Sequence, residues 1–207
     1  NRELRAKEAD IMSNFEYARD IQKACMNRSP SLMAGTMFVL DKPKLVVGGD
    51  FYVAKEKGDS LYVAVGDCTG HGISGGFLSV LGIKAAHSAI DRHESQGDII
   101  SSINSDFYNI VSSADNLKGE SLCLSVVRLS GGNLHFAGSK HKLWLVRGGE
   151  VCEYKSGSMI LGESDEVSVG EIVVAMQPGD VVFLSSDGYP DQFGDGGKGK
   201  LKYSRFR

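Results

Sequence analysis

Glycine-containing turns divide the second half of the sequence into short apolar runs, and this division restricts the chain to a few kinds of fold. The segments "LSGGN", "RGGE" and "QPGD" have the composition of tight turns. The apolar runs around them predict strands at residues 121–129, 133–138, 143–147, 151–155, 171–176 and 181–186. Runs of strands joined by short turns favour antiparallel sheets over a parallel sheet with alternating helices.

The first half of the chain combines helical and strand patterns. Apolar residues recur at spacings of three, four or seven over residues 3–26, without an interrupting glycine or proline. Two consecutive helices are predicted at residues 72–90 and 98–111. Three shorter apolar runs predict strands, at residues 36–40, 51–55 and 61–66. Helices grouped before and between runs of strands predict an α+β domain in which helices cover antiparallel sheets.

The composition is that of one globular domain. The chain has 207 residues, of which 42% are hydrophobic and 24% charged, so it is long enough to bury a sizeable core. Its formal net charge is -3 and no basic stripe runs along it, so we expect no nucleic-acid partner. No apolar stretch approaches the length of a signal sequence or a membrane span, so we expect a soluble domain.

The cysteines indicate a reducing compartment. Cys25, Cys68, Cys123 and Cys152 stand far apart and form no CxxC pair. We expect each to be a small buried hydrophobic residue rather than a metal ligand or a redox centre. The chain is therefore expected in the cytoplasm.

The stretch "VVGGDFYVAKEKGDSLYVAVGDCTGHG", residues 46–72, carries an aspartate at the end of each of two apolar runs. In a hairpin that turns at "EKGDS", Phe51 pairs with Gly66 and the same register sets Asp50 opposite Asp67. Directly opposed residues have Cβ atoms about 4.5–5.5 Å apart, and two carboxylates this close do not readily both ionise without a cation between them. The neighbouring glycines fit ordinary turns, but beside two aspartates they favour a backbone that approaches an ion or a phosphate.

A third acid stands at another strand end. The apolar run "DVVFLSS" is followed by "DGYPDQ", which places Asp187 at the end of the strand and Asp191 one turn later. Oxygen ligands without clustered histidine or cysteine favour Mg²⁺ or Mn²⁺ over zinc. The three strand ends therefore predict a magnesium or manganese site.

Three motifs in order resemble those of a known enzyme family. "GGDFY", "GDCTGHG" before a helix and "SSDGYPDQFG" are similar to motifs of the SpoIIE-like serine/threonine phosphatases, a bacterial branch of the metal-dependent protein phosphatases. "FAGSKHKLWLVRGGE" resembles the central hairpin of that family, and the resemblance covers about residues 10–207. It implies a four-layer α/β/β/α sandwich of two antiparallel sheets flanked by helices. Residues 27–207 would be the phosphatase domain and residues 1–26 an N-terminal helix leading into it.

The resemblance also implies the chemistry and the residues that perform it. The implied reaction is hydrolysis of phosphoserine or phosphothreonine in a partner protein, by water that two Mn²⁺ or Mg²⁺ ions activate. Asp50 and Asp67 are the implied ligands of these ions, with the backbone carbonyl of Cys68 and the side chain of Asp187 as further ligands. His71 is a candidate general acid for the leaving oxygen, although family members have other residues, such as lysine, at this place. The remaining histidines, expected to be ordinary surface or core residues, are His87, His93, His135 and His141.

The sequence departs from the family pattern at three places. "GISGGF" stands where family members often have proline and alanine, so we expect a loosened helix start at residues 74–76. The strand "SLCLSVV" has only Glu120 near its start, where an acid is common, which argues against a third metal. No acid follows Asp195, although the family has a C-terminal helix and a strand preceded by an aspartate ligand. We therefore expect this chain to lack that segment and to bind one ion more tightly than the other.

The resemblance extends to partners. Family relatives commonly act on small phosphoproteins that antagonise anti-sigma factors, which implies a phosphoprotein substrate in bacterial partner switching. The helix over residues 3–26 starts without a capping residue. We therefore expect it either to continue from an upstream sensor domain or to be a helix at the edge of this domain. Its many apolar residues predict a homodimer through this helix.

Two other functions fit parts of the sequence. "GGDFY" is similar to the Gly-Gly-acid-acid-Phe turn of the cyclases that make cyclic di-guanylate, but Phe51 stands where the second acid belongs. A non-catalytic relative that binds a phosphoprotein or senses a signal is the remaining alternative. Retention of Asp50, Asp67 and Asp187 argues against it.

Overall fold

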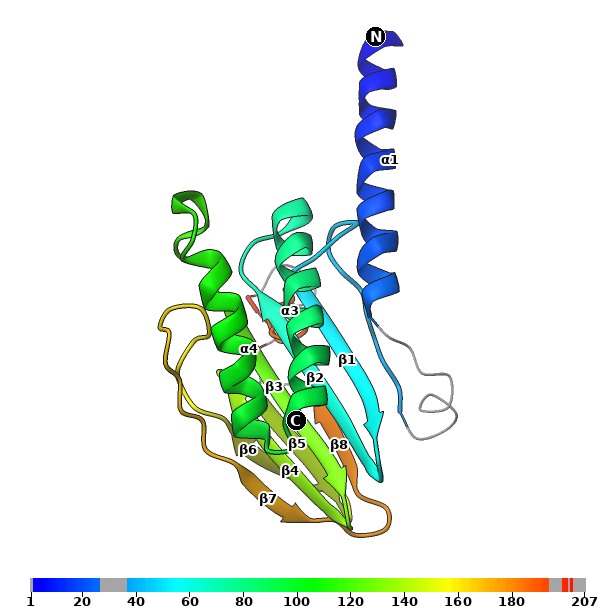
Figure 1. Ribbon diagram of the computed structural model, residues 1–207. Coiled ribbons are helices and arrows are strands. Elements are labelled where there is room, and N and C mark those ends of the chain that lie inside the picture. Colours follow the sequence, from blue (N-terminus) through cyan, green and yellow to red (C-terminus); the bar gives the residue numbers. More distant parts are fainter. Residues whose placement is uncertain (1, 27–36, 194–198, 201, 203–207) are drawn as a thin grey trace.

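Two antiparallel sheets and their helices form the fold in the computed structural model, which describes residues 2–26, 37–193, 199–200 and 202 (Figure 1). The larger sheet has the strand order β1 (Asp50–Lys57), β2 (Ser60–Cys68), β3 (Leu122–Ser130), β4 (Asn133–Ser139) and β7 (Ile172–Ala175). The smaller sheet has the order β6 (Glu150–Lys155), β5 (Lys142–Arg147) and β8 (Val181–Leu184). The helices are α1 (Arg2–Cys25), α3 (Gly72–Arg92), α4 (Gln96–Val111) and the short 3-10 helix η1 (Asp115–Leu117). The predicted α+β fold of two antiparallel sheets flanked by helices is confirmed.

Alternating side chains of the larger sheet face two separate cores. On β3, Leu124 and Val126 belong to the core under the helices, whereas Val127 belongs to the core between the sheets. Helix α3 packs on β1 and β2, and α4 packs on β3 and β4. The helices, the larger sheet and the smaller sheet thus form three of the four expected layers, and among the described residues no helix packs on the outer face of the smaller sheet.

The hairpin and the two central helices lie close to their predicted positions. The β1–β2 register pairs Asp50 with Asp67 and Phe51 with Gly66, as predicted. Helix α3 ends two residues later than expected, and α4 begins two residues earlier. The earlier start of α4 follows from its N-cap, because the hydroxyl of Ser95 accepts a hydrogen bond from the amide of Asp98 at 3.3 Å.

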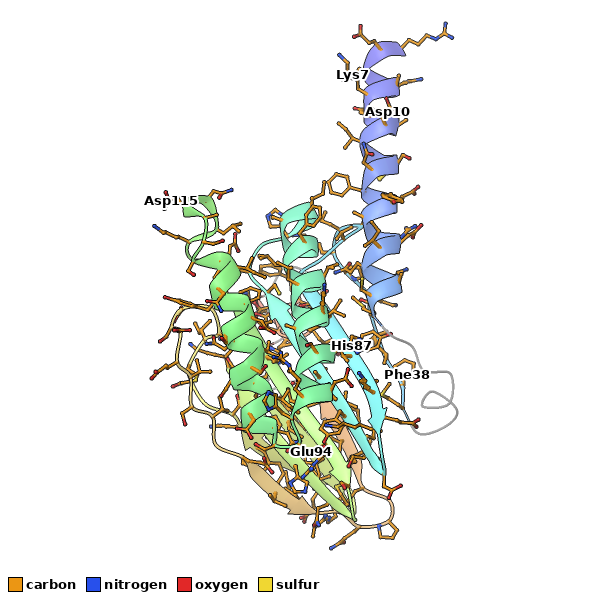
Figure 2. All side chains as sticks on the ribbon, in the orientation of Figure 1. Lys7, Asp10, Phe38, His87, Glu94 and Asp115 are labelled. Carbon is orange, nitrogen blue, oxygen red and sulfur yellow. The ribbon has the colours of Figure 1, made fainter. Side chains whose placement is uncertain are left out.

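The predicted strand at residues 36–40 is wrong for residues 37–40, which form no regular structure. Phe38 and Leu40 are 84% and 63% exposed, and Val39 alone of these residues packs against the core (Figure 2). An apolar run becomes a strand only where a neighbouring strand completes its hydrogen bonds, and no described strand pairs with the outer edge of β1. Residue 36 lies outside the described part of the chain.

The glycine-rich start of α3 is not loosened, because the glycines allow close packing. A Cβ on Gly76 would lie 2.1 Å from Cγ1 of Val47, and one on Gly75 would lie 2.7 Å from the carbonyl oxygen of Gly70. The helix runs without a break from Gly72 to Arg92. These contacts with preceding segments offset the low helix propensity of glycine.

Helix α3 is also long and apolar enough, by length and composition, to cross a membrane, with a mean hydropathy of 1.3 over its most apolar window. The expectation that no segment approaches this length is therefore wrong. The protein buries 56% of that window, and Ile83, Ala86 and Ile90 lie fully inside the core. This is the position of a core helix in a globular domain.

Helix α1 is only partly integrated into the domain. Its C-terminal half lies beside α3, while its N-terminal half extends past the rest of the described chain (Figure 1). Residues 2–14 are all exposed, and Lys7 and Asp10 project from this half (Figure 2). Lower down, Gln22 donates hydrogen bonds to the carbonyl of Gly48 at 2.7 Å and to the hydroxyl of Ser79 at 2.6 Å. The proposed domain boundary after residue 26 stays a prediction, since residues 27–36 lie outside the described part.

The cysteines are all free, but they are not all buried. Cys68 is buried, and Cys25 and Cys123 are half-buried. Cys152 is exposed, so the expectation of burial is wrong for this residue. The reason is its place on β6, the edge strand of the smaller sheet.

Candidate metal centre

The β1–β2 hairpin holds Asp50 and Asp67 directly opposite each other at its open end. The next pair stabilises this register, because the ring of Phe51 covers Gly66. A Cβ on Gly66 would lie 2.3 Å from Cζ of Phe51, so glycine is required for Phe51 to pack under the acids. The predicted opposition of the two carboxyl groups is confirmed.

Burial and mutual repulsion raise the pKa of both aspartates. The pKa of Asp67 is raised to about 8, first by burial and then by the charges of Asp50 and Asp187. Burial also raises the pKa of Asp50, while hydrogen bonds with the side chains of Asp67 and Ser186 oppose that rise. A divalent cation beside these groups would replace repulsion by attraction, so the electrostatics fit metal ligands.

Asp187 reaches the same place from the smaller sheet. It follows the end of β8 by three residues and is exposed. It lines a pocket of ≈ 420 Å³ together with residues 43–45 and 47–50 and with Asp67, Gly70 and His71. The chain after β8 passes close to β1, since a Cβ on Gly188 would lie 3.5 Å from Oδ2 of Asp50. Both sheets therefore contribute an acid to one pocket.

Asp191 does not line this pocket. The amide of Asp191 donates to the carbonyl of Asp187 at 2.9 Å, which closes a turn, and its carboxylate pairs with Lys200. Asp195 lies outside the described residues.

The acids approach one another without forming a closed cage. Within the described ranges, no three or more His, Cys, Asp and Glu side chains lie close enough together to hold a metal ion by themselves. The charges of Asp50 and Asp187 nevertheless act on Asp67. Two carboxylates on neighbouring strands and an exposed third from the segment after β8 fit ions such as Mg²⁺, which keep several water ligands.

The loop after β2 brings its backbone against the start of β1. The amide of Cys68 donates to the carbonyl of Gly49 at 3.2 Å, and a Cβ on Gly49 would lie 2.3 Å from the carbonyl oxygen of Cys68. The carbonyl group that the family resemblance implies as a ligand therefore lies against the residue before Asp50. Gly70 and Gly72 continue the loop at φ +89 and +66, a region that favours glycine.

Thr69 fixes this loop to the start of β3. Its hydroxyl donates to Oε2 of Glu120 and accepts from the amide of Ser121 at 2.8 Å, and its own amide donates to the carbonyl of Ser121 at 2.9 Å. Glu120 thus holds the loop by a hydrogen bond.

Cys123 is the residue near the acids that the sequence did not reveal. It lies opposite Asp67 in the β2–β3 register, and burial followed by the charges of Asp67 and Asp187 raises the pKa of its thiol. Burial likewise raises the pKa of Cys68. Neither thiol is therefore activated as a nucleophile. Cys123 could have been identified from the sequence by extending the predicted hairpin register to a third strand.

His71 lines the pocket at its exposed rim. It occupies the N-cap of α3, but its side chain makes no capping hydrogen bond, and its carbonyl accepts from the hydroxyl of Ser74 at 3.2 Å. Its role as a general acid stays a prediction. His141 lies elsewhere and is buried, and burial lowers its pKa to about 4.

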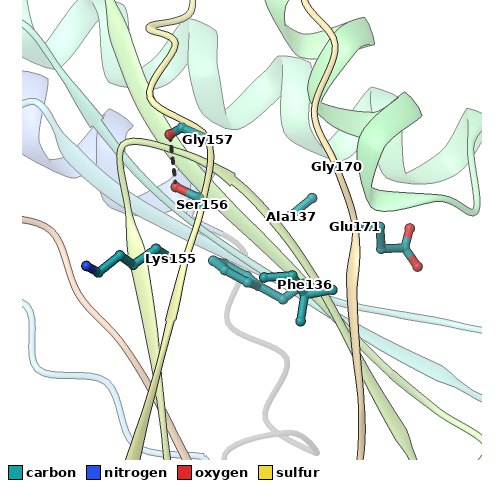
Figure 3. A pocket seen from close by; sticks show the side chains of 8 residues that line it. Phe136, Ala137, Lys155, Ser156, Gly157, Gly170 and Glu171 are labelled. Atoms are coloured by element: carbon teal, nitrogen blue, oxygen red, sulfur yellow. Dashed lines mark hydrogen bonds between the residues drawn. The ribbon is translucent and has the colours of Figure 1, made fainter.

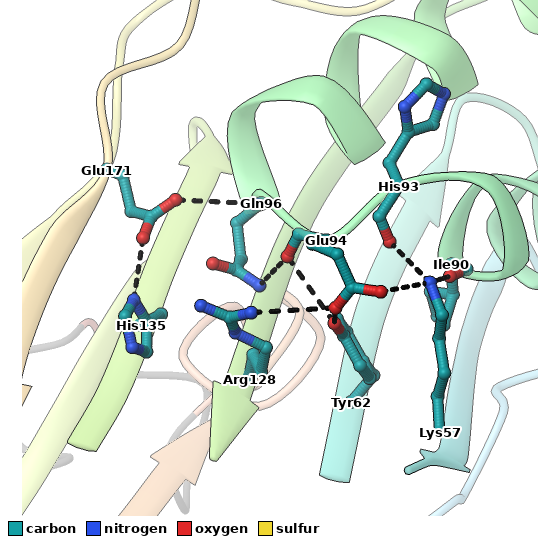
Figure 4. A network of polar contacts seen from close by, with 9 residues as sticks. All are labelled: Lys57, Tyr62, Ile90, His93, Glu94, Gln96, Arg128, His135 and Glu171. Atoms are coloured by element: carbon teal, nitrogen blue, oxygen red, sulfur yellow. Dashed lines mark hydrogen bonds and ion pairs between the residues drawn. The ribbon is translucent and has the colours of Figure 1, made fainter. Parts of the chain in front are cut away.

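A polar network lies at the turn end of the hairpin, away from the acids (Figure 4). Lys57 donates to the carbonyls of Ile90 and His93, each at 3.0 Å, and pairs with Glu94 at 2.7 Å. Glu171 accepts from the amide of Gln96 at 3.3 Å and contacts His135 at 2.7 Å. These contacts fix the α3–α4 turn on the sheet, so the network has a structural role.

A second hollow, of ≈ 310 Å³, lies between β4 and the segments after β6 and before β7 (Figure 3). Phe136 lies at its centre, and the side chains of Lys155 and Glu171 point away from each other. The hollow brings no pair of acids together. It carries no indication of a catalytic site.

Comparison with known families agrees with this geometry. The profile of Stage II sporulation protein E (SpoIIE) matches residues 57–205, which is more than half of the chain. The chain belongs to the SpoIIE family. The matched segment includes Asp67 and Asp187 and begins after Asp50. No sequence among curated proteins matches the chain.

Solved structures place this SpoIIE-family chain among PP2C-type phosphatase domains. The SiaA-PP2C domain of Pseudomonas aeruginosa is 31% identical, with a TM-score of 0.86 over 97% of this chain and 81% of that chain. The RsbU and RsbW domains of Rv1364c from Mycobacterium tuberculosis give a TM-score of 0.60 at 19% identity, over 73% of this chain and 42% of that chain. The catalytic domain of the serine threonine protein phosphatase PstP, in complex with two manganese ions, gives 0.59 at 19% identity, over 75% and 78%. The last two show a shared fold alone.

Proposed function

We propose that this SpoIIE-family domain is a metal-dependent protein serine/threonine phosphatase. The observation that carries the proposal is the opposition of Asp50 and Asp67 in a pocket that Asp187 also lines. In this proposal the three carboxylates and the backbone carbonyl of Cys68 hold two Mn²⁺ or Mg²⁺ ions. The two manganese ions in the structure of PstP support the choice of metal and number.

The residues of the chain hold the ions and the substrate in position. Divalent ions, when bound, supply charge neutralisation for a phosphoryl group and a more acidic water. The paired strands keep Asp50 and Asp67 at a fixed separation. Gly48 and Gly49 line one wall of the pocket, and Gly49 allows the start of β1 to lie against the carbonyl oxygen of Cys68. His71 lies at the exposed rim of the pocket and is the proposed proton donor to the leaving oxygen.

Hydrolysis of p-nitrophenyl phosphate and of a phosphoserine peptide tests this function. We expect turnover in Mn²⁺ or Mg²⁺, loss of turnover in chelator, and recovery when metal is added in excess. Full activity in chelator would contradict the metal mechanism. Absence of turnover with every divalent ion would contradict the phosphatase assignment.

A second candidate is a non-catalytic relative that binds a phosphoprotein. Two observations favour it: Cys123 rather than an acid stands opposite Asp67 on β3, and the described acids form no closed cluster. Saturable binding of a phosphoserine peptide in Mn²⁺ without phosphate release would support this candidate over the enzyme.

For the substrate, we propose a small phosphoprotein of bacterial partner switching, such as an antagonist of an anti-sigma factor. The fold shared with the RsbU and RsbW domains of Rv1364c supports this setting. The net charge of -3 gives no reason to propose a nucleic-acid partner. Phosphate release from a phosphorylated antagonist, compared with a phosphopeptide of the same site, tests the proposal.

We propose a cytoplasmic location and a connecting role for α1. Four free cysteines fit a reducing compartment. The exposed N-terminal half of α1 fits a helix that links the domain to an upstream sensor domain and pairs with a second copy.

A further inference from the structure

An exposed apolar patch adjoins the mouth of the candidate metal centre. This rim patch consists of Leu45, Ile73 and Phe77, whose exposed fractions are 45%, 41% and 68%. Single exposed apolar residues are common on protein surfaces, but a group beside a pocket is typical of a binding surface.

Leu45 connects the rim patch to the pocket. It lines the same pocket as Asp50 and Asp67, and its Cδ1 lies 3.8 Å from the position of a Cβ on Gly72. Gly72 is the first residue of α3 and precedes Ile73 directly. The surface therefore leads from the pocket mouth onto the start of α3.

Packing within the domain does not explain the apolar residues of this patch. Ile73 and Phe77 are four residues apart, so they share one face of α3. The buried face of the same two turns is formed by Gly75, Gly76 and Leu78. Ile73 and Phe77 are thus apolar without contributing to the core of the described residues.

We propose that the rim patch is the docking surface for the phosphoprotein substrate and binds an apolar side chain close to the phosphorylated residue. This inference rests on the proposed phosphatase function. A protein whose phosphoserine enters the pocket must lie across its mouth, which brings the residues next to the phosphoserine over Leu45 and Ile73. The phosphate alone is the same in every substrate, so apolar contact supplies selectivity among phosphoproteins.

Two ten-residue phosphoserine peptides test the docking surface. One carries leucine and phenylalanine on both sides of the phosphoserine, and the other carries serine and alanine at those positions. In Mn²⁺ we expect kcat/KM for the apolar peptide to be about tenfold higher, mainly through KM, because one partly buried apolar side chain has about this effect. Fluorescence anisotropy of the labelled peptides measures binding separately, so the affinities of the two peptides can be compared even without turnover.

Phe77→Asp tests the patch from the side of the enzyme. We expect this variant to lose about tenfold in kcat/KM and in affinity for the apolar peptide, with turnover of p-nitrophenyl phosphate unchanged. The matched control is Val173→Asp, which changes a residue 57% exposed on β7, at the far edge of the larger sheet.

Three results would overturn the docking proposal. They are equal binding of both peptides by the parent, unchanged preference in Phe77→Asp, and conversion of a dimer to a monomer by Phe77→Asp with both peptides affected alike. The last result would assign the rim patch to a second copy. Failure of the parent to hydrolyse p-nitrophenyl phosphate would refute the phosphatase function, while the anisotropy ranking would still decide the docking surface.

Discussion

Asp67 lies opposite Asp50 at the open end of the β1–β2 hairpin, and its pKa is raised to about 8 by burial and by the neighbouring acids. An acid with a raised pKa holds its proton more tightly in the folded chain than in the unfolded chain. Without metal, its contribution to the free energy of unfolding therefore declines as the pH rises from about 4 to about 8. Metal binding at this edge should offset that decline, which links metal affinity to stability.

Asp67→Asn should stabilise the metal-free protein and abolish its activity. At pH 8 we expect the free energy of unfolding to rise by about 1–2 kcal/mol, because the substitution removes the repulsion with Asp50 and Asp187. Near pH 4 the two proteins should be equally stable. Thermal unfolding in chelator measures this difference, and Asp59→Asn, in the turn of the same hairpin, is the control. A variant that melts well below the parent at pH 8 would show that Asp67 has a structural role.

Gly49→Ala should damage the site, whereas Gly48→Ala should not. A Cβ on Gly49 would lie 2.3 Å from the carbonyl oxygen of Cys68, which is backbone and cannot rotate away. The closest contact of a Cβ on Gly48 is Cβ of Pro43 at 3.4 Å, an ordinary distance. We expect Gly49→Ala to lose about 1–3 kcal/mol of stability and at least tenfold in Mn²⁺ affinity. Urea unfolding and calorimetry measure both, and equal behaviour of the two variants would contradict the proposed close approach.

The two metal ions should bind with unequal affinity. Asp50 and Asp67 are paired on neighbouring strands, whereas Asp187 is an exposed residue after β8, so an ion held mainly by Asp187 would have few protein oxygens. Calorimetric titration with Mn²⁺ should therefore resolve two sites that differ at least tenfold. Asp187→Asn should weaken one of them and leave the other. Two equally tight sites in the parent would contradict this distribution of ligands.

His141 should make the domain sensitive to acid. Burial lowers its pKa to about 4, so the folded chain holds the neutral form and the free energy of unfolding falls as the pH drops from about 6.5 towards 4. Between pH 7 and pH 4.5 this residue should account for a loss of about 2–3 kcal/mol. His141→Gln should reduce the difference in urea unfolding between these pH values. His93→Gln is the control, since the ring of His93 points away from the polar network (Figure 4); equal pH dependence of all three proteins would refute the assignment.

Local sequence patterns were sufficient to predict the β1–β2 hairpin and the positions of its two aspartates. The alternation of β1 and β2 and the composition of their turn determine the pairing of Asp50 with Asp67. The period of α3 and α4 likewise follows from one buried face. These features depend on residues close together in the sequence.

Features that depend on distant segments were not predictable. Cys123 lies beside Asp67 only because β3 pairs with β2 after the intervening α3, α4 and η1. Residues 37–40 have the apolar pattern of a strand but find no described partner. The glycines at the start of α3 have low helix propensity, and the close packing of Gly76 against Val47, which precedes β1, offsets it. Each of these outcomes is a tertiary contact that a single segment does not encode.

The N-terminal half of α1 should mediate dimerisation. Leu4 and Ile11 are 58% and 56% exposed, and their spacing of seven residues continues the face on which Ala18 lies half-buried against the domain. An apolar stripe that extends past the domain favours pairing with the same stripe of a second copy. Leu4→Ser combined with Ile11→Ser should therefore weaken self-association at least tenfold, as measured by light scattering over a range of concentrations. Met12→Ser, which changes an exposed residue on another face of α1, is the control. A parent that remains monomeric at the highest concentration would show that α1 is not a dimer contact.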